Sequence, residues 1–243
     1  DVCSSDLILD TETTGHKRDE DSICQIALLS NISGEWEALE SYVNSEKEIT
    51  SNAMAIHHIT NEMIEGAPLF HESAPLHFLE KHNTAEHIIV IQNAVFDLGV
   101  LRNMGFIWKG RVLDTLICAK HLLNTPRHAL QYLRYELGLY KNEKVIAQAL
   151  GKTLNAHDAL SDVIITKLLL NHLLLLADNN IDNLLTLTDE PVLLKVIPFG
   201  KYKNETFETI ADFDPNYLRW CLSDMKKLNK DARNAIEFWL EKQ

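Results

Sequence analysis

The sequence predicts an α/β fold in which a mixed sheet is flanked by helices. Two observations favour it: short apolar runs typical of strands recur between residues 7 and 113, and segments with helical spacing separate and follow them. The chain of 243 residues is long enough for this domain and a small, mainly helical second one, taking about 150 residues per domain as a guide.

The expected elements follow in chain order. Strands are expected at 7–10, 23–29, 36–43, 88–91 and 112–113, and helices at 51–65, 73–82, 96–104, 115–123, 129–137 and 159–177. The polar stretch 178–183 and the Asp189-Glu190-Pro191 punctuation indicate a hinge. We therefore expect a domain over 7–180, a linker over 181–193 and a C-terminal domain over 194–243, which a helix at 231–240 closes. Residues 1–6 resemble a truncation and are left out of the functional argument.

Three polar motifs stand at the edges of apolar runs. They are Asp10-Thr-Glu12, Asn93-Ala-Val-Phe-Asp97 and His157-Asp-Ala-Leu-Ser-Asp162, with the first strand expected to stop at Asp10. Carboxylates crowd together only around a cation, and hard oxygen ligands suit Mg²⁺ or Mn²⁺. Two such ions about 3.5–4 Å apart are a common device for cleaving phosphodiesters. The sequence therefore predicts two divalent ions held by Asp10, Glu12, Asp97 and Asp162.

In order and spacing these motifs resemble the DEDDh 3′→5′ exonuclease superfamily. The resemblance implies the RNase H-like exonuclease fold and hydrolysis from the 3′ end that releases 5′-mononucleotides. It also implies that one ion activates water, that the other stabilises the leaving 3′ oxygen, and that His157 acts as the general base. Gln25 departs from the pattern, because many relatives have Glu before Ile-Ala; it is not a ligand, so only the tuning of the site is affected.

His157 is expected in the loop before the long helix. Five residues at about 100° each place it about 140° from Asp162, so the two cannot share one helical face. A neutral imidazole there can accept a proton near pH 7. Asp158 is a rival ligand because it lies four residues before Asp162, although a helix N-terminal acid stabilised by the dipole is the preferred interpretation.

Four further residues are expected to contact the terminal nucleotide. Thr13 would do so through its backbone or hydroxyl, His57 through the phosphate or sugar as the resemblance implies, and Asn93 while fixing its loop. Phe96 is also a candidate contact, although a core position suits it better than base stacking.

The C-terminal segment resembles the C-terminal domain of the exodeoxyribonuclease X family, in which Phe-Gly-Lys-Tyr and Asp-Pro-x-Tyr-Leu-Arg-Trp recur. This resemblance favours DNA as the substrate, for repair or proofreading-type end processing. Lys201, Lys203 and Arg219 are the expected phosphate contacts, because charged ends rarely belong to a core. Trp220 is expected in the core of the small domain.

Composition leaves several alternatives open. The net charge is −12, but residues 191–243 hold nine Lys/Arg against eight Asp/Glu, which suits an enzyme that grips a few nucleotides at an end. An exoribonuclease of the RNase T kind shares all the motifs, and a non-catalytic module would require a lost ligand. DNA 3′ ends, single-stranded or duplex, are the expected partners; a homodimer or a polymerase or repair partner stays open.

The cysteines and the apolar stretches indicate the cellular setting. The four cysteines show no metal or disulfide spacing, which favours a reducing cytoplasm. No membrane span is expected, because the apolar stretch 164–177 contains Lys167, Asn171 and His172.

Overall fold

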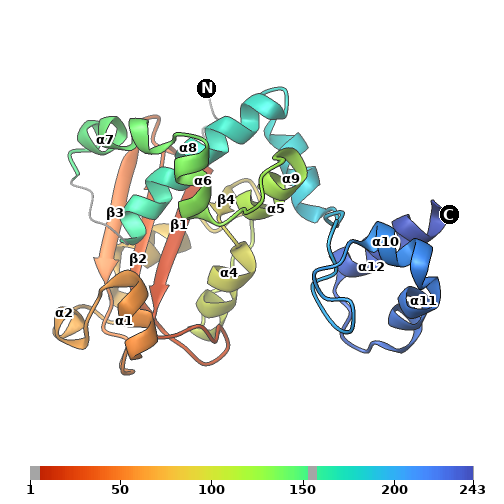
Figure 1. Ribbon diagram of the computed structural model, residues 1–243. Coiled ribbons are helices and arrows are strands. Elements are labelled where there is room, and N and C mark those ends of the chain that lie inside the picture. The colour runs from red at the N-terminus through yellow and green to blue at the C-terminus, as the bar shows by residue number, and fades with distance from the viewer. Residues whose placement is uncertain (1–5, 153–157, 243) are drawn as a thin grey trace. The chain divides into compact units, whose positions relative to one another are not determined.

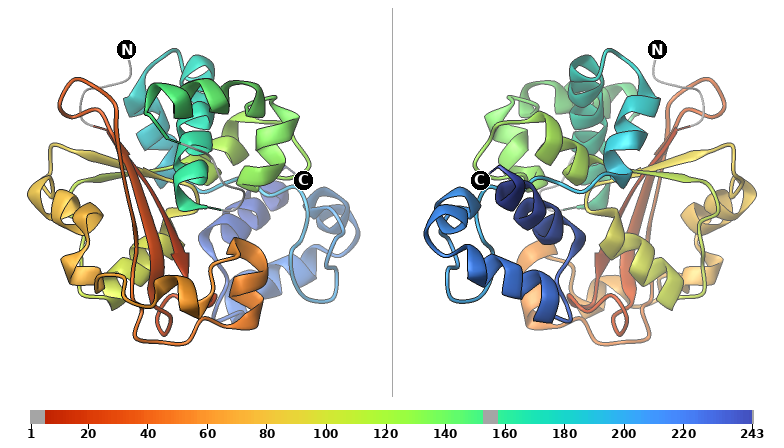
Figure 2. Two further views of the ribbon diagram at one scale, coloured as in Figure 1. Left: turned by 90° about the vertical axis from the view of Figure 1, so that its left-hand side faces the viewer. Right: turned by 90° about the vertical axis from the view of Figure 1, so that its right-hand side faces the viewer.

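The computed structural model describes residues 6–152 and 158–242 and divides into two units between Thr188 and Asp189. The first unit is a five-stranded sheet with helices on both faces (Figures 1 and 2). Its strands are β1 (Asp6–Thr13), β2 (Ile23–Ser30), β3 (Glu37–Tyr42), β4 (Ile88–Ile91) and β5 (Arg111–Asp114), in the spatial order β3-β2-β1-β4-β5. The first three strands form an antiparallel meander, and β4 and β5 continue it in parallel with β1. This arrangement confirms the predicted RNase H-like exonuclease fold.

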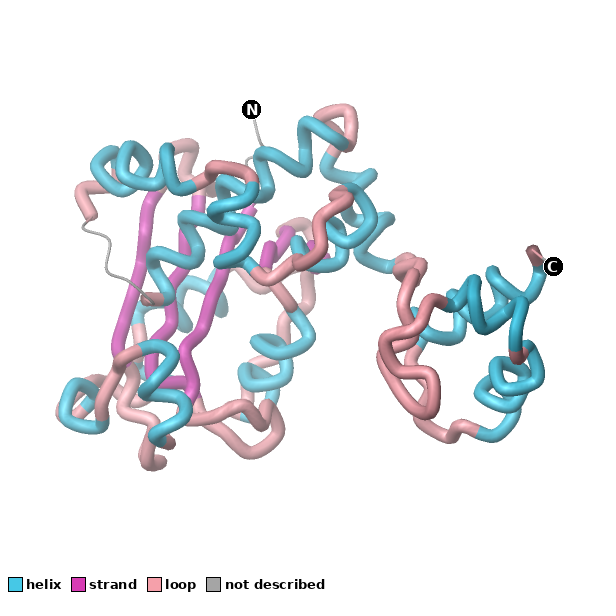
Figure 3. Tube along the Cα trace, viewed as in Figure 1, coloured by secondary structure: helices cyan, strands magenta, loops and turns pink. Residues whose placement is uncertain are grey.

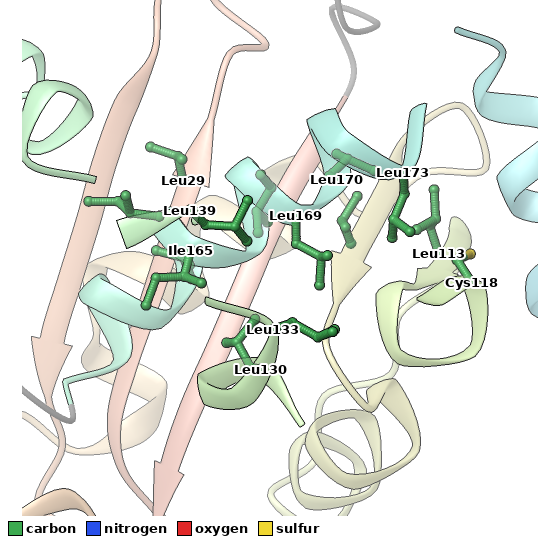
Figure 4. Packing of buried hydrophobic residues seen from close by; sticks show 14 of the residues in the cluster. Leu29, Leu113, Cys118, Leu130, Leu133, Leu139, Ile165, Leu169, Leu170 and Leu173 are labelled. Atoms are coloured by element: carbon green, nitrogen blue, oxygen red, sulfur yellow. The ribbon is translucent and has the colours of Figure 1, made fainter. Parts of the chain in front are cut away.

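The sheet separates two hydrophobic clusters, because successive side chains of a strand point to opposite faces. On one face, α3 (Ala74–Lys81) and α4 (Ala94–Asn103) cover Leu7, Leu9 and Ile89. On the other face lie α5 (Thr115–Leu122), α6 (Leu130–Glu136), α7 (Tyr140–Ala149), α8 (Ala159–Leu176) and α9 (Ile181–Asp189). Figure 4 shows this second cluster, in which leucines of α8 pack between Leu29, Leu113 and Leu133.

Helix α8 is the central element of that face. It contacts β1, β2, α5, α6 and α7, and most of its residues are buried. In the described part of the chain it is also the one helix that is long and apolar enough, by length and composition, to cross a membrane, whereas none was expected. Since 61% of that window is buried inside the unit, the core position accounts for its composition.

The structure changes several expected boundaries. The helix expected at 51–65 is two helices, α1 (Ser51–His57) and α2 (Asn61–Ile64), because His58 takes the left-handed conformation (φ 61°) and ends the first. A short 3₁₀ turn, η1 (Phe70–Glu72), precedes α3, and helix α7 was not expected. Figure 3 shows how the helices and loops alternate along the chain.

The expected linker over 181–193 starts too early. Residues 181–189 form α9, whose Leu184 is fully buried in the cluster around α8. Arg111 on β5 pairs with Asp182 at 2.9 Å, and the Asp114 N–H donates to Thr188 Oγ1. The polar composition of 178–183 therefore reflects a helix start on the surface, and the division between the units falls at the C-terminal end of α9.

The second unit is helical, as predicted. It contains α10 (Phe207–Phe213), α11 (Pro215–Asp224) and α12 (Lys230–Glu241) around a core of Ile197, Phe207, Leu218 and Ile236. Each helix has a side-chain N-cap, supplied by Thr206, Asp214 and Asn229.

Candidate active site

Strand β1 places Asp10 and Glu12 on the face of the sheet that α8 covers. Ile8, Asp10 and Glu12 alternate with Leu7, Leu9 and Thr11, so the two carboxylates follow Ile8, which lies in the α8 cluster. The strand does not stop at Asp10 as expected, because it pairs with β2 through Thr13. Its pairing with β4 does stop, at Ile8 and Val90. The carboxylates therefore lie on a strand that is held on one side and open on the other.

Asp10, Glu12 and Asp162 form a compact cluster. Each offers one carboxylate oxygen, and the three oxygens lie within 4.8 Å of one another. Burial and the charges of Asp162 and Asp97 raise the pKa of Glu12 to about 8 and raise the pKa of Asp10 well above its usual range. Three half-buried carboxylates this close together repel one another, and divalent cations that prefer oxygen ligands would supply the compensating positive charge.

Asp97 reaches the same place through Thr11, the residue between Asp10 and Glu12. The Asp97 Oδ1 atom accepts the Thr11 N–H at 3.1 Å and the Thr11 hydroxyl at 2.7 Å. Burial raises the pKa of Asp97 to about 7, although these hydrogen bonds oppose the shift. The structure thus places three of the predicted ligands in one cluster and attaches the fourth, Asp97, to the strand residue between two of them.

Asp162 is held by a polar network from two other helices. Its Oδ1 atom accepts Gln131 Nε2–H at 2.7 Å, and Gln131 Oε1 accepts an Arg134 N–H at 3.1 Å. Arg134 then donates to both oxygens of the buried Glu143, at 2.6 and 2.8 Å. Burial still raises the pKa of Asp162 to about 6, with Arg134 acting against it. The network restricts rotation of the Asp162 carboxylate, and none of the sequence motifs indicated it.

The N-terminus of α8 is fixed by Gln25 on β2. Gln25 Nε2–H donates to Asp158 Oδ1 at 2.6 Å, and Gln25 Oε1 accepts the Ala159 N–H at 3.2 Å. Asp158 caps α8 by accepting the Leu160 N–H, which confirms the preferred interpretation of Asp158 as a helix N-terminal acid. His157, the predicted general base, lies outside the described residues.

Asp114 is a buried acid that the sequence analysis did not single out. Its side chain accepts the backbone N–H groups of Leu116 and Ile117, as the N-cap of α5, and those of Asn93 and Ala94 at the start of α4. Burial raises the pKa of Asp114 against these four donors. Asp114 thereby holds the turn from which Asp97 projects, and its place between a short strand and a helix was the available sequence signal.

Two predicted nucleotide contacts are used inside the protein. His57 is 4% exposed, its Nε2 lies 3.2 Å from the Thr13 carbonyl oxygen, and its Nδ1 accepts the Ile59 N–H at 3.0 Å. The Thr13 hydroxyl donates to the Gly15 carbonyl at 2.6 Å. Both ring nitrogens and the hydroxyl are therefore engaged within the protein, where His57 supports the strand end beyond Glu12. The contacts of His57 and Thr13 with a nucleotide stay predictions.

The other two predicted contacts differ from each other. Asn93 is exposed and has a left-handed backbone (φ 71°) at the start of α4, and its side chain does not cap the helix. Phe96 is half-buried and packs on the cluster under α3 and α4. Asn93 thus stays a candidate for substrate contact, whereas the position of Phe96 fits the core alternative.

The predicted phosphate contacts lie in the second unit. Lys201, Lys203 and Arg219 are all exposed. Trp220 was expected in the core, but it is 51% exposed, because Leu218 and Cys221 are the residues of α11 that face inward. Among the described residues, the carboxylate cluster therefore consists of Asp10, Glu12 and Asp162, with Asp97 joined to it through Thr11.

Comparisons with known proteins agree with this geometry. Residues 7–170 match the RNase T family model, described as Exonuclease, and residues 197–224 match the model described as Exodeoxyribonuclease X-like C-terminal. The chain belongs to the DEDDh exonuclease family. It is 29% identical over 235 residues to exodeoxyribonuclease 10 of Escherichia coli K12, covering 96% of this chain and 98% of that protein. It is also 31% identical to a DNA polymerase III subunit epsilon-like protein of Rhodobacter capsulatus, over 63% of this chain and 23% of that protein.

Solved structures share the fold. Exonuclease X in complex with 5′-overhanging duplex DNA aligns with a TM-score of 0.57 at 24% identity, covering 75% of this chain and 99% of that one. Exonuclease I of E. coli in complex with an oligonucleotide aligns with a TM-score of 0.51 at 19% identity, over 76% of this chain and 42% of that one. As a member of the DEDDh family, the chain is a homologue of phosphodiester hydrolases that act as 3′→5′ exonucleases.

Proposed function

We propose that this chain is a divalent-metal-dependent 3′→5′ exonuclease that hydrolyses DNA and releases 5′-mononucleotides. The observation that carries the proposal is the carboxylate cluster of Asp10, Glu12 and Asp162, with Asp97 attached through Thr11. DNA as the substrate is supported by the similarity to exodeoxyribonuclease 10 along nearly the whole chain and by the matching C-terminal segment.

The four carboxylates would hold two Mg²⁺ or Mn²⁺ ions. Bound there, the ions would offset the charge of the attacking and leaving oxygens. The donor set fits them, since all four side chains are oxygen ligands and no cysteine is involved. Asp10 and Glu12 share one strand, and Asp97 is fixed on the residue between them, so three of the four ligands move with β1.

The remaining residues of the site position the ligands and the proton acceptor. Gln131 orients the Asp162 carboxylate, and Gln25 fixes the helix start that directly follows His157 in the sequence. His157 would accept the proton of the attacking water, for which the ordinary histidine pKa near 6.5 suits neutral pH.

A time course on matched DNA and RNA oligonucleotides, labelled at the 3′ or the 5′ end, tests the proposal. With Mg²⁺ we expect early loss of the 3′ label, 5′-mononucleotides as products and faster hydrolysis of DNA; with excess EDTA we expect none. Asp10→Asn should abolish turnover. Asp19→Asn is the matched control, because it removes the same charge from a side chain that is 83% exposed. Full hydrolysis in EDTA would refute metal dependence, and hydrolysis of RNA alone would favour an exoribonuclease.

The same proposal assigns the enzyme to DNA end processing, as in repair, in a reducing cytoplasm. Cys24, Cys118 and Cys221 are buried free thiols, which such a compartment preserves. The alternative of a non-catalytic nucleic-acid-binding module is disfavoured because each of the four ligand positions carries a carboxylate.

A further inference from the structure

The two motifs of the C-terminal unit form one structure around Gly200. This glycine has a positive φ of 66°, and a Cβ atom on it would clash with the Tyr217 hydroxyl oxygen. The N–H of the next residue, Lys201, donates to the same hydroxyl at 3.3 Å. Only glycine therefore allows the first motif to approach the tyrosine of the second.

Asp214 holds the same two segments together from the other side. One carboxylate oxygen accepts the Tyr202 hydroxyl at 2.8 Å and lies 3.6 Å from Lys201 Nζ. The other accepts the Tyr217 N–H at 3.2 Å, at the start of α11. These bonds lower the pKa of Asp214, with the Tyr202 hydroxyl as the main cause, and they fix both tyrosine residues by their polar groups.

The rings of Tyr202 and Tyr217 continue in a row of aromatic contacts to Trp220. Tyr202 and Tyr217 meet edge to face, with ring centroids 4.9 Å apart, and Tyr217 and Trp220 are 6.0 Å apart at an angle of 34°. Lys201 Nζ lies 4.5 Å from the Tyr202 centroid at the other end. This aromatic ladder of Tyr202, Tyr217 and Trp220 begins against the core of the unit and ends in an indole that is 51% exposed.

We propose that Trp220 is a stacking platform for an unpaired nucleobase of the substrate strand. This rests on the proposed function in one respect, that the substrate is a nucleic acid. Aromatic side chains beside cations are the usual means of holding single strands without sequence preference, because every base has a flat face. Because Trp220 already packs against Tyr217, its side chain loses little conformational entropy when a base stacks on it.

The charges beside the ladder favour a nucleic acid over a protein as the occupant. Lys201 and Arg219 are exposed and adjoin the ladder residues in the chain, and both can approach phosphates. Protein–protein interfaces are depleted of Lys although they are enriched in Arg, so Lys201 is the residue that favours a nucleic acid. The second unit also lacks the acidic excess of residues 1–190.

Equilibrium binding of the full chain in EDTA tests the platform without hydrolysis. The probe is a fluorescent DNA duplex with a single-stranded 3′ tail, measured by polarisation. Trp220→Ala should weaken binding by about 5- to 30-fold, the loss expected when one base no longer stacks. Trp220→Phe should keep most of the affinity. Phe213→Ala is the matched control, because Phe213 is 77% exposed in the same unit but is not a ladder residue, and it should bind as the parent does.

A second arm tests for a base on the indole. Single abasic sites are placed along the tail; one position should reproduce the Trp220→Ala loss in the parent protein and cause no further loss in Trp220→Ala. An equal effect with an RNA tail supports the same platform and extends its occupant to RNA.

Unchanged affinity of Trp220→Ala, fully additive losses, or an equal loss in Phe213→Ala would overturn the proposal. A fall in the melting temperature of Trp220→Ala with unchanged DNA affinity would also overturn it, because the indole would then stabilise the fold of this chain and would not bind a base. Since binding is measured without hydrolysis, a chain that binds through Trp220 but cuts no DNA refutes only the proposed function. If the chain cuts DNA but its Trp220 variants bind DNA with unchanged affinity, only this inference is refuted.

Discussion

Swapping the amide of Gln25 and the carboxylate of Asp158, by Gln25→Glu and Asp158→Asn, would test whether this pair fixes the start of α8 beside the carboxylate cluster. Gln25 lies opposite Glu12 in the β1–β2 register, and its amide reaches the first residues of α8. The side chains of both partners are buried, since Gln25 is 4% and Asp158 is 7% exposed. Because the Asp162 N–H donates to the Asp158 carbonyl, a shift at Asp158 passes directly to Asp162.

The two single substitutions should differ greatly in cost. In Gln25→Glu two carboxylates would meet where a 2.6 Å hydrogen bond now stands. A lost hydrogen bond to a charged group costs about 1.5–3 kcal/mol and a broken buried pair about 3–5 kcal/mol, so we expect a loss of about 3 kcal/mol in the free energy of unfolding. Asp158→Asn should cost about 1 kcal/mol or less, because asparagine caps helices as well as aspartate does.

The double variant should recover most of the loss. The amide introduced at position 158 could donate to the carboxylate introduced at position 25. That carboxylate could still accept the Ala159 N–H, and the net charge of the pair would be unchanged. We expect the double variant to lie within about 1 kcal/mol of the parent, which gives a coupling of about 3 kcal/mol, at the upper end of the range for residues in contact.

Urea unfolding of the four proteins in EDTA measures the coupling, and hydrolysis rates with Mg²⁺ measure its effect on the reaction. A cost of less than about 1 kcal/mol for Gln25→Glu, or a double variant no more stable than Gln25→Glu, would show that the Gln25–Asp158 contact does not hold the start of α8. If the double variant regains stability but stays inactive, and Asp158→Asn is also inactive, then Asp158 acts in the reaction itself and not only as a helix cap.

Four further outcomes are expected. His157→Ala should slow hydrolysis by about 10²–10⁴-fold while Mn²⁺ binding by calorimetry stays intact; a collapse of metal affinity would make His157 a ligand. Gln131→Ala should weaken Mn²⁺ binding and reduce activity, and Gln131→Glu should be worse than Gln131→Ala because it adds a like charge beside Asp162; equal behaviour would contradict an orienting role. In EDTA the melting temperature should fall as the pH rises from about 5 to 8, because the folded protein keeps a proton on Glu12 up to a pKa of about 8 that the unfolded chain releases near 4.5, and Mg²⁺ should abolish the fall. Ending the chain after Glu190, beyond α9, should leave mononucleotide release from short single strands but weaken duplex binding and flatten its salt dependence; an unchanged salt slope would remove the C-terminal unit from DNA binding.

The sequence was sufficient to find the four carboxylates because each motif is tied to a local signal. Asp10 and Glu12 follow an apolar strand, Asp97 follows Asn93 at a strand–helix turn, and Asp162 lies in the first turn of a helix. Strand and helix periodicity place such residues without knowledge of the tertiary contacts.

The supporting residues could not be predicted, because their roles depend on contacts between distant segments. Gln131 reaches Asp162 from a different helix, and Arg134 depends on Glu143 of α7, a helix with few apolar positions to reveal it. Gln25 was noticed as a departure from the family pattern, but its partner Asp158 lies 133 residues away. Trp220 was misplaced for a related reason, since a motif shows which residues recur but not which of them face the core.

The burial of helix α8 explains why the carboxylate cluster at its start favours a polar network and would favour a cation. The helix is apolar on nearly all sides because β1, β2, α5, α6 and α7 surround it, and this burial is the source of its membrane-like composition. An acid on such a helix is costly to ionise, and even with Gln131 and Arg134 beside it the pKa of Asp162 stays raised to about 6. The protein's own donors therefore compensate the Asp162 charge only in part, and Asp10 and Glu12 add further negative charge at the same point. Without a cation a proton on Glu12 compensates part of this charge, and a divalent cation that displaced the proton would let all three carboxylates ionise, as the proposed function requires.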